Sequence, residues 1–208
     1  DAWYEDVSET LSETGAEFLL IPNGSPYDRE KLSVRQNIMV ARVIETGLPL
    51  IYLNMVGGQD DQVFDGGSFV LNPGGALAVQ LPLFEDTVAH IDLLRGPEGW
   101  CAEDGPKARI PDMLEQDYHA MVLGVRDYLR KSGFAKVLLG LSGGIDSAIV
   151  ATIAADAIGA ENVRCVMLPS DYTSESSLQD AKDVAENLGC AYYFVPITEG
   201  QACLLYTS

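Results

Sequence analysis

A glycine-rich string between two apolar segments constrains this chain most. Residues 138–147 read Leu-Leu-Gly-Leu-Ser-Gly-Gly-Ile-Asp-Ser. The apolar residues over 136–141 predict a strand, and the Ala- and Ile-rich residues that follow the string predict a helix to about Ile158. A strand that passes into a helix through paired glycines is typical of parallel α/β sheets, which bind ligands at the carboxyl ends of their strands.

The residue types in this string suit a phosphate-binding loop. Gly143 and Gly144 let the backbone approach an anion closely, and free N–H groups at a helix start supply donors and the positive dipole end. Ser142 and Ser147 add hydroxyl groups, and Asp146 adds an oxygen ligand suited to Mg²⁺. We therefore expect a phosphate-binding site with Asp146 as the metal ligand. Its predicted residues are Gly140, Leu141, Ser142, Gly143, Gly144, Ile145, Asp146 and Ser147.

A plain glycine turn with a Ser/Asp helix cap is the alternative interpretation of this string. Such caps are common, but the full Ser-Gly-Gly-x-Asp-Ser string after an apolar strand and before an apolar helix is far rarer. No Gly-Lys-Ser/Thr follows it, so it is not a P-loop kinase motif, and it lacks the Gly-x-Gly-x-x-Gly spacing of dinucleotide-binding folds.

The order of predicted elements divides the chain into two parts. Over 111–202 a helix from Asp112 precedes alternating strands and helices, the signature of a doubly wound parallel sheet. Over 1–94 strands flank one helix, and residues 22–26 form a turn cluster. Gly and Pro fill 95–110, which predicts a linker. The predicted strands are 17–21, 50–53, 68–71, 76–80, 87–94, 136–141, 163–168 and 191–195, and the predicted helices are 28–45, 112–133, 145–158 and 174–188.

The net charge limits the classes of molecule that this chain is expected to bind, and the cysteine pattern indicates the redox state of its compartment. The net charge is −18, from 31 acidic and 13 basic residues, and such a field repels nucleic-acid backbones and anionic membranes. A phosphate ligand must then be held locally, by backbone N–H groups and a metal. No Cys-x-x-Cys pair, leader segment or membrane-spanning apolar run is present in the sequence, so we expect reduced thiols and a cytoplasmic location.

The string at 142–147 resembles the loop of the N-type ATP pyrophosphatases, which adenylate a substrate and release pyrophosphate. The flanking segments are similar to glutamine-dependent NAD synthetases in particular. These segments are 124–134 before the loop, and 167–170, 172–177 and 180–181 after the second strand of that part.

The first half is similar to the end of the nitrilase-like glutaminase domain of the same family. The match lies in Pro-Asn-Gly-Ser-Pro at 22–26, Tyr-Leu-Asn-Met-Val-Gly-Gly-Gln at 52–59 and Phe-Asp-Gly-Gly-Ser-Phe at 64–69. The resemblance implies an α/β chain: the C-terminal part of a nitrilase-like α/β sandwich (1–94), then the start of a doubly wound, adenine nucleotide alpha hydrolase-like domain (111–202).

The resemblance also implies an activity. ATP adenylates the carboxylate of deamido-NAD, ammonia from glutamine displaces AMP, and pyrophosphate is released, with Mg²⁺ as cofactor. The implied partners are ATP, deamido-NAD and glutamine, with a homo-oligomeric full-length protein. Ser25 and Lys31 match glutamine-binding positions of the family, although by themselves a turn serine and a helix-start lysine would favour a solvated cap.

Departures from the family pattern limit what this chain is expected to do. A nitrilase-like site needs a Glu-Lys-Cys triad, and in the family the cysteine lies just before an Asp-x-Trp like that at 1–3. We therefore expect an internal fragment that carries no catalytic residue and is inactive by itself. Cys101, near Glu103 and Asp104, is rejected as a substitute because it lies in the predicted linker with no strand to present it. Residues 203–208 match no expected continuation and are interpreted as a non-native tail.

Several residues have both a structural and a functional interpretation. His90 and His119 lack partners at metal-ligand spacing, so structural or exposed positions are expected. Arg35 and Arg42 are expected on a solvated or salt-bridged helix face. Leu168, at a strand end, is interpreted equally as an adenine contact or as core.

Two rival functions remain open from the residues. One is another N-type ATP pyrophosphatase, such as a tRNA-modifying enzyme, which the net charge and the nitrilase-like half oppose. The other is a non-catalytic nucleotide-binding protein that has kept the loop, which the intact Asp146 opposes.

Overall fold

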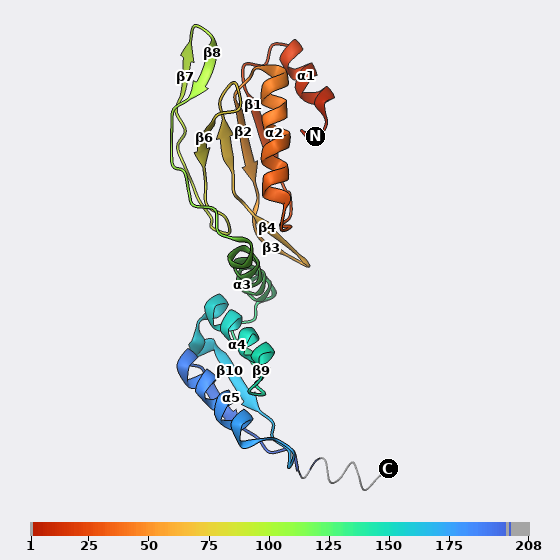
Figure 1. Cartoon of the computed structure of the whole chain (residues 1–208), viewed down its shortest axis with the longest axis vertical. Helices are drawn as coiled ribbons and strands as arrows, with labels where there is room; N and C mark the ends of the chain where they lie inside the picture. Colours follow the sequence, from red (N-terminus) through yellow and green to blue (C-terminus); the bar gives the residue numbers. More distant parts are fainter. Residues whose placement is uncertain (1, 199, 201–208) are drawn as a thin grey trace. The chain divides into compact units, whose positions relative to one another are not determined.

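The computed structural model describes residues 2–198 and 200, and these form two compact units (Figure 1). The first unit extends to Ala120, and the second begins at Met121. The predicted tail at 203–208 lies outside the described residues. No helix within the described ranges has the length and apolarity to cross a membrane.

A four-stranded sheet of order β1-β2-β5-β6 is the centre of the first unit. β1 and β2 are parallel, with Leu19 opposite Leu50 and Asn23 opposite Asn54, whereas β5 and β6 are antiparallel additions. The carboxyl ends of β1 and β2 therefore meet at one edge. The four strands are β1 (Leu19–Asn23), β2 (Leu50–Asn54), β5 (Phe69–Leu71) and β6 (Leu77–Gln80).

Helix α2 (Lys31–Thr46) connects β1 to β2 and covers one face of this sheet. Its buried Met39 and Val43 pack in one cluster with Leu50 and Tyr52. The ring of Tyr52 stacks on that of Phe69 at 4.9 Å between centroids. The helix ends at Gly47 in the left-handed conformation, which suits glycine. Helix α1 (Glu5–Glu13), which the sequence patterns missed, lies beside α2 (Figure 1).

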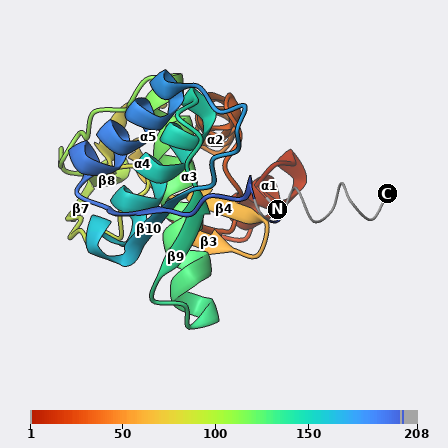
Figure 2. The ribbon, with the colours of Figure 1, turned by 90° about the horizontal axis from the view of Figure 1, so that it is seen from below.

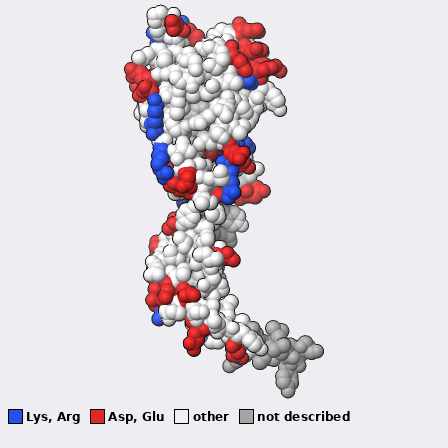
Figure 3. All heavy atoms as spheres, in the orientation of Figure 1, with Lys and Arg blue, Asp and Glu red and all other residues white. Residues whose placement is uncertain are grey.

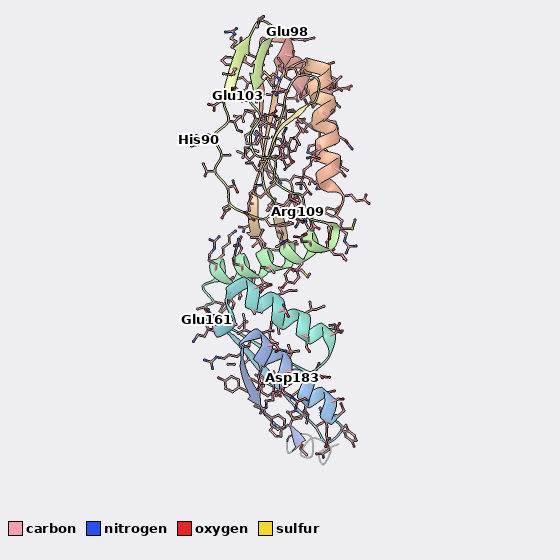
Figure 4. All side chains as sticks on the ribbon, turned by 60° about the vertical axis from the view of Figure 1, so that its left-hand side comes forward. His90, Glu98, Glu103, Arg109, Glu161 and Asp183 are labelled. Atoms are coloured by element: carbon pink, nitrogen blue, oxygen red, sulfur yellow. The ribbon has the colours of Figure 1, made fainter. Side chains whose placement is uncertain are left out.

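Two hairpins in the first unit were not expected. β3 (Val56–Gln59) pairs with β4 (Gln62–Asp65), and β7 (Leu93–Gly96) pairs with β8 (Gly99–Ala102). Figure 4 shows Glu98 at the tip of the second hairpin. The predicted strand over 87–94 is therefore wrong over most of its length: Thr87 to Asp92, which include His90, have no regular structure.

The prediction of a linker over 95–110 is also corrected. The β7–β8 hairpin occupies its first part, and Arg95 and Trp100 both bond Glu17. Further on, the N–H of Gln80 donates to the Pro106 carbonyl at 2.9 Å, and the N–H of Ala108 donates to the Gln80 carbonyl at 2.9 Å. Gly and Pro here belong to a hairpin with a two-residue turn and to a segment that pairs with the sheet edge. Their abundance alone therefore wrongly predicted a linker.

A parallel sheet of order β11-β10-β9 is the centre of the second unit. Helices α4 and α5 contact each other and pack on the same face (Figure 2). This confirms the expected strand–helix alternation. The opposite face carries the exposed side chain of Leu138. The elements are the later part of α3 (Met113–Ser132), β9 (Val137–Gly140), α4 (Ile145–Ile158), the 3₁₀ turn η1 (Ala160–Asn162), β10 (Val163–Met167), α5 (Glu175–Leu188) and β11 (Ala191–Phe194).

The core of the second unit lies between this sheet and its two helices. Leu141, Val163 and Cys165 are essentially inaccessible there. Two of the helix starts have side-chain caps. Asp112 Oδ1 accepts the Glu115 N–H at 3.0 Å, and Ser174 Oγ accepts the Ser177 N–H at 3.1 Å.

The reactivity of the cysteine thiols depends on whether the helices and the sheet of the second unit are packed together. Burial raises the pKa of Cys165 to about 11 and also raises the pKa of Cys190, whereas Cys101 is exposed. Because the thiolate is the reactive form, a Cys203→Ser variant at pH 8 should show one rapidly labelled thiol, Cys101. The other two should react only after guanidinium is added. Three rapid thiols in a disulfide-exchange assay would contradict the packing of α4 and α5 on the sheet.

Candidate functional site

The loop between β9 and α4 begins at the carboxyl end of a strand, as predicted. The N–H of Leu141 donates to the Val166 carbonyl at 2.8 Å, so pairing with β10 continues to the loop's first residue. Gly143 has φ +81°, and a Cβ there would lie 2.3 Å from the Ser177 carbonyl oxygen. No other residue fits, because both the backbone conformation and the space exclude a side chain.

Hydroxyl groups hold the loop closed on itself. Ser147 Oγ donates to the Gly144 carbonyl at 2.9 Å and lies 3.1 Å from Ser142 Oγ. The N–H of Ser142 donates to Ser147 Oγ at 3.2 Å, and the N–H of Gly144 donates to Ser142 Oγ at 3.3 Å. The two serines therefore set the shape of the turn from which α4 starts.

A cavity of about 500 Å³ opens beside this loop, a size that suits a small-molecule ligand. The N-terminal turn of α5 contributes hydroxyls to the same wall. The described lining includes neither lysine nor arginine, so an anion there would depend on backbone N–H groups and hydroxyls. The lining residues are Gly140, Leu141, Ser142, Met167, Leu168, Tyr172, Thr173, Ser174 and Ser177.

Leu168 is a wall residue of this cavity and not part of the core. Half of its surface is exposed, so the core interpretation is wrong. Tyr172, which is 95% exposed, lies in the connection from β10 to α5 and lines the same cavity.

Asp146 lies exposed in the first turn of α4, one position after Ile145. The described residues contain no group of three or more His, Cys, Asp or Glu that would hold a metal ion by themselves. One carboxylate beside a phosphate-binding loop nevertheless fits Mg²⁺, which is commonly held by one or two carboxylates together with substrate phosphates. On the face that Figure 3 draws, acidic side chains are scattered over both units, which agrees with the net charge of −18.

The turn that carries Ser25 lies just past the end of β1 in the first unit, and Ser25 is buried there. Its N–H donates to Asn54 Oδ1 at 2.9 Å, and its hydroxyl oxygen accepts Arg35 Nε at 3.0 Å. Its carbonyl accepts Arg35 Nη2 at 3.0 Å and Asn54 Nδ2 at 3.1 Å. Ser25 is thus fixed by contacts from α2 and β2.

A buried ion pair anchors these contacts. Arg35 Nη1 lies 2.9 Å from each carboxylate oxygen of Asp65, and both side chains are 1% exposed. Asn54 Nδ2 also donates to Asp65 Oδ1 at 3.3 Å. Burial raises the pKa of Asp65, and the Arg35 charge and its hydrogen bonds oppose that rise. Removing one partner would leave an uncompensated buried charge.

The solvated part of the expectation for Arg35 and Arg42 is therefore wrong, and the salt-bridged part is confirmed. Arg42 is also buried and pairs with Glu45 at 2.8 Å. Both arginines share the buried helix stripe with Met39 and Val43, at the i, i+4, i+7, i+8 spacing that marks a core-facing stripe. That spacing was the signal that sequence reasoning missed.

Lys31 is half-buried at the first position of α2, and its charge opposes the rise in the pKa of Asp65. Ser25 and Lys31 therefore lie with Asp65 at the same end of the sheet. Neither histidine forms a metal site with other residues in the described part of the chain. Cys101, contrary to the expectation of an unstructured linker, lies on strand β8.

Known families match both parts of this chain. The carbon-nitrogen hydrolase model matches residues 1–96, and the NAD synthase model matches residues 117–206. A glutamine-dependent NAD(+) synthetase from Rhodobacter capsulatus is 61% identical over 204 residues, covering 98% of this chain and 37% of that protein. The chain is similar over nearly its whole length to glutamine-dependent NAD(+) synthetases. It spans well under half the length of these relatives, and the match to the NAD synthase model extends into the 203–208 segment.

Solved structures of NAD(+) synthetases are similar in fold to this chain. The glutamine-dependent NAD+ synthetase from Acinetobacter baumannii, solved with ADP, has a TM-score of 0.93 at 36% identity and covers the whole of this chain and 39% of its own. The enzyme from Cytophaga hutchinsonii has a TM-score of 0.77 at 18% identity over 94% of this chain and 38% of its own, which supports the fold alone. A nitrilase-like part followed by the start of an NAD synthetase part is thus confirmed.

Loss of the buried guanidinium should destabilise the first unit. Arg35→Ala is expected to lower the free energy of unfolding by about 3–5 kcal/mol, because Asp65 stays buried without its partner. Lys107→Ala breaks an exposed pair with Asp104 and should cost about 1 kcal/mol or less. Urea unfolding followed by tryptophan fluorescence measures this unit, since Trp3 and Trp100 both lie in it. Equal losses in the two variants would show that the buried pair is not an anchor.

Proposed function

We propose that the full-length protein containing this chain is a glutamine-hydrolysing NAD synthetase. It amidates deamido-NAD in an ATP-dependent reaction, through an adenylated carboxylate, with ammonia from glutamine and release of AMP and pyrophosphate. The observation that carries this proposal is the Ser142–Ser147 loop at the carboxyl end of β9, beside a 500 Å³ cavity, in a chain whose other half is nitrilase-like.

The chemistry explains why such a loop is needed. A carboxylate is a poor electrophile, so the nicotinate carboxylate must be activated before ammonia can attack it. Adenylation expels pyrophosphate, and negative charge develops on that leaving group. Backbone N–H groups at the start of α4 are the proposed donors for this charge, and the hydroxyls of Ser142 and Ser147 hold these groups in place. Their arrangement is already set by hydrogen bonds within the loop.

Asp146 is the proposed ligand for Mg²⁺ on the ATP phosphates. The bound ion would neutralise charge on the phosphates of the leaving group. In an acidic chain this local compensation matters, because the global field opposes ATP binding. Gly140, Leu141 and Ile145 complete the proposed ATP contacts through their backbone.

The first unit is proposed to hold glutamine at the end of its parallel strands. Ser25 is preset there by Arg35 and Asn54, and the cationic Lys31 suits a carboxylate of the substrate. Small-molecule partners alone are proposed: the acidic surface argues against nucleic acid. A cytoplasmic, homo-oligomeric full-length protein stays part of this proposal.

The ATP site can be tested separately from the glutamine site. We use a full-length enzyme in which this chain replaces the matching segment of the Rhodobacter capsulatus relative. Asp146→Asn should lower ATP-dependent NAD formation about a hundredfold, the order expected when one contact to developing charge is removed, while glutamine hydrolysis stays measurable. Asp183→Asn, on the exposed side of α5, is the matched control. Unchanged NAD formation in Asp146→Asn would refute the role given to this residue. Tight ATP binding by the unmutated enzyme without pyrophosphate release would favour the non-catalytic alternative.

The nitrogen-donor site is tested by comparing two nitrogen sources. Lys31→Ala should raise the KM for glutamine about tenfold or more, from a lost charge-assisted contact, and should spare NAD formation from free ammonia. Ser25→Ala should act likewise but also lower stability, because it leaves Arg35 Nε without its acceptor. Equal losses with both nitrogen sources would mean that Lys31 acts on the fold and not on glutamine.

A further inference from the structure

The turn that carries Ser25 is held at a second point, by the start of helix α3. Tyr27, two residues after Ser25, donates its hydroxyl to Asp117 Oδ1 at 2.8 Å. Arg29 donates to Asp117 Oδ2 through Nη2 at 2.6 Å and through Nε at 3.0 Å. Arg29 Nε also lies 3.3 Å from Asp117 Oδ1, so one carboxylate accepts four hydrogen bonds from the segment between Ser25 and α2.

The electrostatics of this contact favour a charge-assisted bond. Arg29 and Tyr27 lower the pKa of Asp117 through their hydrogen bonds, and burial and Asp117 raise the pKa of Tyr27. At neutral pH the carboxylate is therefore ionised and the phenol is protonated, which gives the shorter and stronger class of hydrogen bond. The Asp117 side chain is only 22% exposed, whereas that of Arg29 is 60% exposed, so the Tyr27 bond is the better shielded of the two.

Aromatic packing joins the same two segments. The ring of Tyr27 meets that of Phe84 edge-on at 5.4 Å, and the ring of Phe84 stacks on His119 of α3 at 6.0 Å. Phe84 is 6% exposed, has φ +61°, and donates its N–H to the Asp65 carbonyl at 2.9 Å. A bulky residue in that backbone region is strained and persists only when its surroundings hold it. The contact with α3 is thus built from both polar and ring interactions.

Helix α3 also leads to the nucleotide site along the chain. It is a single helix from Met113 to Ser132, and its later residues belong to the second unit. β9, which ends at the Ser142 loop, begins five residues after it. Asp117 therefore lies on the helix that covalently connects the two candidate sites. A helix is a stiff element that can carry a displacement along its length.

We propose that Asp117 is a positioning residue that couples the Ser25 turn to α3, so that ammonia release in the first unit stays matched to amide formation in the second. This rests on the function proposed above. Tyr27 is the partner that transmits the position of the turn, and Arg29 holds the carboxylate toward it. Asp117 does not touch substrate; it sets where Ser25 and Lys31 lie for a given position of α3.

The test uses the same full-length enzyme and measures glutamate formed per NAD formed, together with the KM for glutamine and the rate with free ammonia. Asp117→Ala should raise the glutamate-to-NAD ratio about threefold or more, within the range of coupling changes caused by residues between sites. It should leave the ammonia-supported rate within about twofold of the unmutated enzyme. Tyr27→Phe, which keeps the ring against Phe84, should give the same shift, and the double variant should add little to it, because both act through one bond.

Glu115→Gln is the matched control, because it breaks another ion pair, with Arg109, two residues earlier on α3. It should leave the ratio unchanged. Asp117→Asn keeps the shape of the side chain and guards against misfolding of the alanine variant; it should give a smaller shift in the same direction. An unchanged ratio in Asp117→Ala, or an equal loss with glutamine and ammonia, would overturn the coupling role. Failure of the unmutated enzyme to form NAD from ammonia would overturn the proposed function, and this inference with it.

Discussion

The absence of a side chain at Gly143 is the constraint on which the second unit depends. The backbone there passes so close to the Ser177 carbonyl that a Cβ would overlap it at 2.3 Å. This close approach ties the turn after β9 to the start of α5, and the cavity lies between these two segments. The loop's hydroxyl network and the direction of α4 follow from that turn. One glycine therefore fixes both the packing of two helices and the shape of the phosphate-binding loop.

The first unit also has a constrained turn at the carboxyl ends of its parallel strands, but there a buried charged side chain, and not a missing one, holds the turn. There a charged group is buried and compensated: Arg35 and Asp65 pair inside the protein and hold Ser25 from both its hydroxyl and its carbonyl. Such a pair gives little net stability over apolar packing, but it fixes a polar turn in one geometry. In both units strong local constraints position a short turn, and the substrate contacts proposed here lie on these two turns.

The sequence predicted well what local patterns determine. The strands and helices of the second unit and the loop at 142–147 follow from apolar periodicity and paired glycines. Local sequence patterns were sufficient to predict these elements, because each helix packs on the strands that are next to it along the chain. The role of the predicted site residues as ligand contacts stays a proposal.

The features that could not be predicted from the sequence depend on contacts between residues far apart along the chain. The composition of 95–110 predicted a linker, but its place is decided by pairing with β6 and by bonds to Glu17, which are far away in sequence. Arg35 was expected on a solvated or salt-bridged helix face, and only its partner Asp65, thirty residues later, explains its burial. The contact of Tyr27 with Asp117 joins residues ninety positions apart. A local sequence pattern cannot predict contacts between residues so far apart along the chain.

Amide hydrogen exchange in the 208-residue chain, with and without Mg·ATP, tests whether the loop at 142–147 is the phosphate site. Mg·ATP should slow exchange at the amides of residues 143–147, because these N–H groups bond the phosphates. AMP, which lacks the β- and γ-phosphates, should have little effect there, and Gly143→Ala should abolish the ATP effect. ATP-dependent protection elsewhere in the chain, with exchange at 143–147 unchanged, would contradict the assignment of this loop as the phosphate site.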